Sequence, residues 1–135
     1  MLEKFPLPED RVHFVGSLPY GEYVKLIKCT HAHVYLTRPF VLSWSMLEAM
    51  SCEGLVIASD TAPVQEVITN GINGLLVDFF RPDQLAQTIS NVLDRPNDFA
   101  QMRKKARETV VAKYDLTSCL QQRLAWLSGL LAANR

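Results

Sequence analysis

The segment from Thr37 to Glu48 combines residue types that can bind a ligand carrying phosphate and hydroxyl groups. It leaves a predicted strand, passes Arg38, and enters a predicted helix over residues 44–53 with Ser43 as its N-cap. The first N–H groups of a helix lack partners within the helix and carry the positive end of its dipole. Such a helix start can hold a phosphate group, and Arg38 would add a cation. Every parallel α/β domain has such helix starts and most bind nothing, so this geometry alone leaves the question open.

Two other groups of residues are weaker candidates. Asp60, followed by Thr61, stands at a predicted strand end like the phospho-acceptor of a receiver domain. A receiver domain also needs an acidic pair after its first strand, where this chain has Gly-Ser. His31 and His33 lie on one side of a predicted strand, but no carboxylate or cysteine pair accompanies them at ligand spacing. We therefore expect core or surface histidines and no metal site.

Strand and helix patterns alternate four times along the chain. The unbroken apolar run at 54–59 predicts a strand covered on both faces. We expect a Rossmann-like α/β domain, with a parallel sheet of about four strands, helices on both faces and two C-terminal helices. The predicted strands cover 11–16, 33–37, 54–59 and 74–78, and the predicted helices cover 21–29, 44–53, 62–69, 82–94, 97–114 and 116–132. Ligands of open parallel sheets bind beyond the carboxyl ends of the strands, here 16–20, 37–43, 59–63 and 78–81.

The composition narrows the class of protein. The chain has 135 residues, 48% of them hydrophobic, which suits one globular domain. Lys plus Arg equals Asp plus Glu at 14 each, so no basic field points to nucleic acid. Residues 1–10 look like a lead-in or linker without the apolar segment of a signal peptide. The three scattered cysteines fit neither a disulfide framework nor a zinc site, and we expect a cytoplasmic protein.

A basic cluster in the predicted helix 97–114 leaves two interpretations open. Arg103, Lys104, Lys105 and Arg107 could attract an anionic membrane surface, which would make the protein peripheral to the membrane. Alternatively, an apolar stripe in the same helix packs on the sheet and leaves a solvated basic face. That stripe consists of Phe99, Met102, Ala106 and Val110.

Four linked motifs resemble a known family in the right order. They are Leu47–Met50, Val56–Ser59, Glu66–Ile68 and Asn73–Val77. The whole stretch from 47 to 89 is similar to the C-terminal half of group 1 glycosyltransferases, which are retaining, nucleotide-sugar-dependent enzymes of the GT-B fold. The similarity extends over residues 11–132.

The resemblance implies a donor-binding site. Glu48 would accept hydrogen bonds from the ribose hydroxyls of the donor, a task that suits a carboxylate. The donor phosphate and sugar would meet Arg38, Phe40, Val41, Leu42, Ser43 and Leu47; the nucleobase would meet Gly16, Leu18 and Tyr20; Glu66 matches a further position near the donor. No metal or other cofactor is implied.

This sequence also departs from the family pattern. The first glutamate of the family's pair, which meets the donor sugar, falls on Phe40. The glycine pair that usually follows is replaced by Val41, Leu42 and Ser43, so side chains crowd the approach to the helix start. These departures keep open a non-catalytic binding or scaffold domain with a degenerate donor site.

The resemblance also implies that residues 11–135 form an incomplete C-terminal nucleotide-sugar-binding domain. The expected partners are a nucleotide-sugar donor and the N-terminal acceptor domain of the same parent chain. The family's diphosphate-clamping Arg and Lys would lie upstream. We therefore expect no glycosyl transfer by these residues alone, and an exposed sheet edge that can pair with a second copy.

Overall fold

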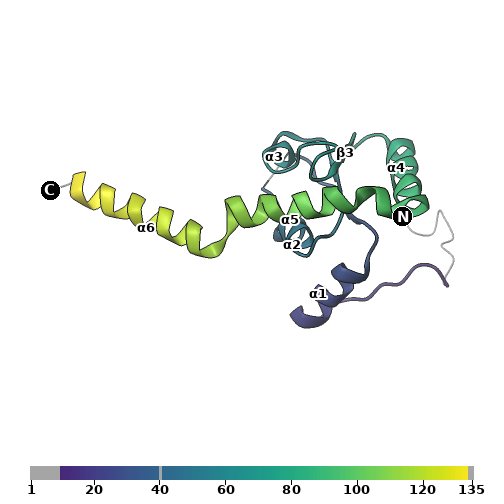
Figure 1. The fold of residues 1–135 in the computed structure, drawn as a ribbon, viewed down its shortest axis with the longest axis horizontal. Coiled ribbons are helices and arrows are strands. Elements are labelled where there is room, and N and C mark those ends of the chain that lie inside the picture. Colours follow the sequence, from purple (N-terminus) through teal and green to yellow (C-terminus); the bar gives the residue numbers. More distant parts are fainter. Residues whose placement is uncertain (1–9, 40, 134–135) are drawn as a thin grey trace.

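The computed structural model describes residues 10–39 and 41–133 and shows an α/β domain with a parallel sheet (Figure 1). Three strands lie in the order β1 (His33–Tyr35), β2 (Val56–Ser59) and β3 (Leu75–Val77). The helices are α1 (Tyr20–Cys29), α2 (Trp44–Ser51), α3 (Ala62–Gln65), α4 (Pro82–Asp94), the 3-10 helix η2 (Pro96–Phe99), α5 (Ala100–Tyr114) and α6 (Leu116–Ala133). The predicted fold class is confirmed, with one strand fewer than expected.

The central strand β2 organises the core. Its residues are all buried, as the unbroken apolar run predicts. Ile57 pairs with Val34 of β1 and with Leu75 of β3, so both neighbours run parallel to β2. Because side chains alternate along a strand, β2 contributes to two separate apolar clusters.

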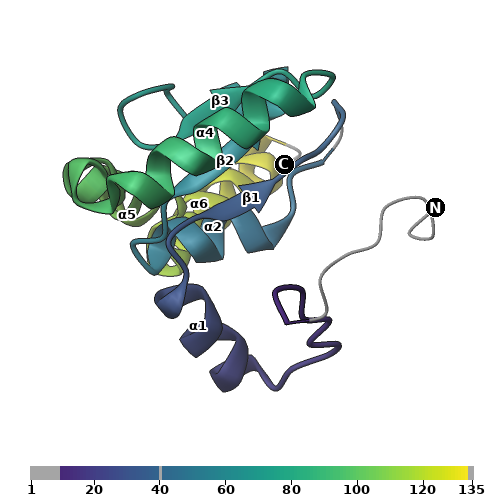
Figure 2. The ribbon, with the colours of Figure 1, turned by 90° about the vertical axis from the view of Figure 1, so that its right-hand side faces the viewer.

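Helices cover both faces of the sheet (Figure 2). Val56 and Ala58 of β2 pack in one cluster, which includes Met46, Ala49 and Met50 of α2 and Ala106 of α5. On the other face, Leu55, Ile57, Val77 and Val92 of α4 form the second cluster. The predicted apolar stripe of helix 97–114 is confirmed, because Ala106 is buried while Phe99, Met102 and Val110 pack against these clusters.

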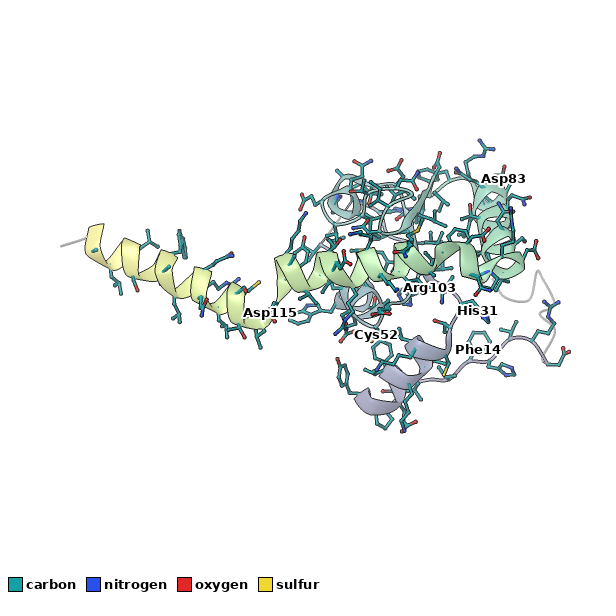
Figure 3. All side chains as sticks on the ribbon, viewed as in Figure 1. Phe14, His31, Cys52, Asp83, Arg103 and Asp115 are labelled. Carbon is teal, nitrogen blue, oxygen red and sulfur yellow. The ribbon has the colours of Figure 1, made fainter. Side chains whose placement is uncertain are left out.

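The predicted strand at 11–16 is wrong. These residues are an irregular segment leading into α1, with Phe14 80% exposed and Val15 54% exposed (Figure 3). Gly16 ends the segment with a φ of +62°. An apolar run becomes a strand only where a neighbouring strand completes its backbone hydrogen bonds, and none of the three strands in the described ranges pairs with it.

Some helix boundaries also differ from the prediction. The helix expected over 62–69 ends at Gln65, and the helix expected over 97–114 divides into η2 and α5. The last helix, α6, extends away from the rest of the domain (Figure 1). None of the helices in the described part of the chain is long and apolar enough to cross a membrane.

Candidate functional site

The loop between β1 and α2, where the sequence places the site, is anchored at both ends. At its start, Thr37 donates its backbone N–H to Ser59 Oγ at 2.9 Å, and Ser59 Oγ donates to the Thr37 carbonyl at 2.7 Å. At its end, the Ser43 N–H donates to the Tyr35 hydroxyl at 2.9 Å. Since Ser59 and Tyr35 are buried, the core of the sheet positions this loop.

The start of α2 has the geometry that the sequence predicts. Ser43 is the N-cap, and its Oγ accepts the backbone N–H of Ser45 at 3.3 Å. Val41 and Trp44 on either side are exposed. Phe40, the residue at the family's first glutamate position, lies outside the described residues. The side chains of Val41 and Trp44 therefore extend into solvent at the start of α2.

Glu48 is half-buried on α2, beside Tyr23 of α1. Burial raises the pKa of the Tyr23 hydroxyl, and the neighbouring Glu48 carboxylate raises it further because a phenolate would be repelled. Tyr20, a predicted nucleobase contact, lies one helical turn before Tyr23, and their ring centroids are 6.3 Å apart. Tyr23 therefore lies between Glu48, the predicted ribose contact, and Tyr20, a predicted nucleobase contact.

Sequence reasoning did not include Tyr23 in the site. Tyr23 lies within the helix predicted over 21–29. Its spacing of three residues from Tyr20 places both rings on one helix face and was the available signal.

The other residues that the sequence predicts as donor contacts lie on several different elements. Leu42 and Leu47 line an apolar hollow of about 400 Å³ at the junction of α2, α5 and α6, together with Trp44, Tyr114, Leu116 and Cys119. Gly16 is exposed and Leu18 is half-buried on the segment before α1. Glu66 is exposed at the end of α3, and no hydrogen bond or ion pair among residues 10–39 and 41–133 joins it to the other site residues.

A second hollow, of about 590 Å³, lies beyond the carboxyl ends of all three strands. We call it the strand-end hollow. Its walls come from the loops that follow β1, β2 and β3, as expected for a ligand site of a parallel sheet. It is lined by Arg38, Pro39, Asp60, Thr61, Ala62, Asp78, Phe79 and Phe80. Of these residues, the sequence-based site included only Arg38.

Two carboxylates of the strand-end hollow are held by protein contacts. Asp60 Oδ1 accepts from Gln65 Nε2 at 2.6 Å, and Asp78 Oδ1 accepts the backbone N–H of Phe80 at 2.8 Å. The Arg38 guanidinium lies over the Phe79 ring, with its Cζ 6.0 Å from the ring centroid. The hollow thus combines fixed hydrogen-bond acceptors, a cation and aromatic surface.

Three basic residues of α5 have partners within the domain. Arg103 Nη2 donates to the His31 carbonyl at 2.9 Å, and Arg107 donates to the Ser51 carbonyl at the end of α2. Lys105 pairs with Glu108 at 2.6 Å. Within the described part of the chain, no group of three or more His, Cys, Asp or Glu residues could hold a metal ion.

Loops that gather cations, carboxylates and a helix start at the carboxyl ends of parallel strands define a Rossmann-like ligand-binding domain. The particular family follows from comparison with known proteins. The family model for glycosyl transferases group 1 matches residues 4–109, and the chain belongs to this family.

Relatives and solved structures agree with this assignment. Alpha-D-kanosaminyltransferase of Streptomyces kanamyceticus is 27% identical over 113 residues, which are 84% of this chain and 29% of the relative. Sucrose-phosphate synthase of Thermosynechococcus elongatus is 31% identical, with a TM-score of 0.78 over 93% of this chain and 31% of that structure. The structure of Anabaena HepE in complex with UDP and glucose has the same fold, with a TM-score of 0.82 and 23% identity over 90% of this chain and 33% of that one. The chain spans about a third or less of the length of these proteins.

Proposed function

We propose that this chain is the donor-binding half of a retaining glycosyltransferase and binds a nucleotide-diphosphate sugar. The Glu48 carboxylate accepts hydrogen bonds from the ribose, and the start of α2 receives the diphosphate near Arg38. Gly16, Leu18 and Tyr20 contact the nucleobase. The structural neighbour HepE is described with UDP and glucose and with UDP-glucose, which supports this class of ligand.

One observation carries the proposal most directly. Glu48, the family's ribose position, stands beside Tyr23 and close to the N-cap of α2, so acceptor, aromatic rings and helix start lie on neighbouring elements. A carboxylate accepts from two adjacent hydroxyls at once, and free N–H groups at a helix start bind phosphate. Ribose and diphosphate are adjacent in a nucleotide sugar, and Glu48 follows the N-cap by five residues on the same helix.

Transfer itself is proposed for the parent protein. The chain spans 29% of its kanosaminyltransferase relative, and the acceptor-binding half is proposed to come from elsewhere in the parent chain. We propose that these 135 residues bind the donor without transferring its sugar. A metal is not part of the proposal, since phosphate would meet the helix start and Arg38.

A second candidate is a non-catalytic binding or scaffold domain of the same fold. The specific observation in its favour is Phe40, which has no acceptor atoms in its side chain at the family's sugar-contacting position. This candidate predicts no binding of nucleotides at the α2 start.

Titration of the ¹⁵N-labelled chain with UDP, GDP and ADP, followed by amide shifts, separates the two candidates. The proposed function predicts that one nucleotide moves the amides of 38–48 and 16–23 in a saturable manner. If all three nucleotides leave these amides in place, the scaffold domain is the better description.

A further inference from the structure

We propose that Tyr35 and Ser59 are positioning residues for phosphate binding. Their hydroxyl groups fix the two ends of the loop that carries Arg38 and leads into α2. Both act through the main chain of this loop and not by touching the ligand. The inference rests on the proposed function and adds to it the buried side chains that set the affinity for the diphosphate.

Tyr35 joins the core of the sheet to the start of α2. It is the last residue of β1, and its ring is buried in the cluster that contains Met46 and Ala49 of α2. A phenylalanine ring would fill the same space, so packing does not require the hydroxyl. That hydroxyl accepts the backbone N–H of Ser43, the N-cap of α2, at 2.9 Å. The hydroxyl therefore serves the position of the N-cap.

The hydrogen bond to Ser43 restricts the amide groups that follow it. Ser43 has a φ of −77° and a ψ of 144°, the extended conformation of an N-cap residue. Peptide groups are planar, and consecutive ones share a Cα atom. Holding the peptide of Ser43 therefore limits the directions in which the N–H groups of Trp44 and Ser45 can point. These N–H groups belong to the helix start that is proposed to receive phosphate.

Ser59 has the corresponding role at the other end of the loop. The register of β1 and β2 ends at the pair Tyr35 and Ala58. One residue further along β2, the fully buried Ser59 accepts the Thr37 N–H at 2.9 Å and donates to the Thr37 carbonyl at 2.7 Å. One side chain thus supplies two hydrogen bonds beyond the end of the ladder. They fix the residue that precedes Arg38.

These two anchors affect phosphate more than any other part of the ligand. A diphosphate gains from the helix start and from Arg38 only when both face it together. A loop that is already fixed at Thr37 and Ser43 loses less conformational entropy when the ligand binds. The proposed nucleobase contact Tyr20 lies on α1 and is not held by either anchor. Removing an anchor should therefore weaken phosphate binding selectively.

The test compares a nucleoside with its 5′-diphosphate, because the two ligands differ only in the phosphate groups. Uridine, guanosine and adenosine are paired with UDP, GDP and ADP, and the pair whose diphosphate binds tightest to the ¹⁵N-labelled chain is used. We expect Tyr35→Phe and Ser59→Ala each to weaken diphosphate binding about fivefold, the scale of one hydrogen bond, and to leave nucleoside binding unchanged. In the free Tyr35→Phe chain, the amide proton of Ser43 should move upfield.

Ser90→Ala is the matched control, because Ser90 is exposed on α4, and this variant should bind both ligands as the unmodified chain does. Unchanged diphosphate affinity in an anchor variant, or an equal loss of nucleoside and diphosphate, would overturn the positioning role of that residue and leave the proposed function standing. If circular dichroism shows that one variant does not fold, the other variant decides. Absence of binding by all three diphosphates to the unmodified chain would overturn the proposed function and the inference together.

Discussion

At the scale of single residues, Glu48 of the motif Leu47–Met50 lies beside Tyr23, a side chain outside the four family motifs. The carboxylate and the phenol come from different helices, α2 and α1. Each can bond a ribose hydroxyl, since the carboxylate accepts and the Tyr23 phenol can donate. These two residues are therefore where substitution should affect nucleotide binding most.

Glu48→Gln should weaken nucleotide binding by about 1–2 kcal/mol, because it removes the charge and one acceptor while keeping the shape. Isothermal titration or amide shifts with the preferred nucleotide would measure this. Glu108→Gln, on the exposed side of α5, is the control and should bind as the unmodified chain does. An unchanged affinity in the Glu48 variant would remove the ribose role.

His33 gives the stability of the domain a pH dependence of known sign. Burial lowers the pKa of His33 from its ordinary value of 6.5. Between that lowered pKa and 6.5 the unfolded chain binds more protons than the folded one, so stability must fall as the pH drops through this window. Urea unfolding at several pH values should show this slope.

His33→Gln should flatten the slope, because the substituted side chain does not titrate. His31→Gln removes an exposed imidazole two residues away and should leave the slope in place. A His33 variant that retains the full slope would mean that another group causes it.

At the scale of elements, Asn73 joins the turn before β3 to helix α5. Its Oδ1 accepts the Thr69 N–H at 2.7 Å, and its Nδ2 donates to the Val67 carbonyl and to Thr109 Oγ1, each at 3.0 Å. Asn73 is 4% exposed, so water does not replace these partners. The neighbouring Asn70 also sits in the turn but is exposed and bonds only the Leu76 N–H by its Oδ1.

Asn73→Ala should destabilise the domain by about 2 kcal/mol, because it leaves a backbone donor and acceptor without partners in the interior. Asn97→Ala, at an exposed position of η2, should change stability by less than about 0.5 kcal/mol. The free energy of unfolding from urea titration measures both. Similar values for the two variants would show that the Asn73 network contributes little.

At the scale of the whole molecule, α6 presents an uncovered apolar face. Five leucines recur along it at helical spacing, and their side chains are between 45% and 72% exposed. They are Leu116, Leu120, Leu127, Leu130 and Leu131. The opposite face carries the uncharged polar residues Ser118, Gln121 and Gln122. This row of exposed leucines is interrupted by Arg123 but leaves apolar surface open to a partner, so association is expected beside the pairing proposed for the sheet edge.

We expect the isolated chain to self-associate with rising concentration and Leu127→Lys to shift it toward the monomer. Gln121→Lys adds the same charge to the other face of α6 and should not. Sedimentation equilibrium at several concentrations measures the mass. A mass that stays monomeric at every concentration would contradict association through either surface.

The amino-acid sequence by itself determined the α/β class, the strands at 33–37, 54–59 and 74–78 to within a few residues, the N-cap at Ser43 and the family. These features depend on local patterns, such as apolar runs, turn residues and linked motifs. The sequence did not reveal that residues 11–16 lack a strand partner, because pairing depends on segments far apart in the chain. Only the tertiary structure decided that Tyr23 stands beside Glu48 and that Arg38, Asp60 and Asp78 share one hollow. Parallel pairing brings the carboxyl ends of three strands to one edge of the sheet. The residues that follow these strands are far apart in the sequence, so their positions along the chain do not show that they are neighbours.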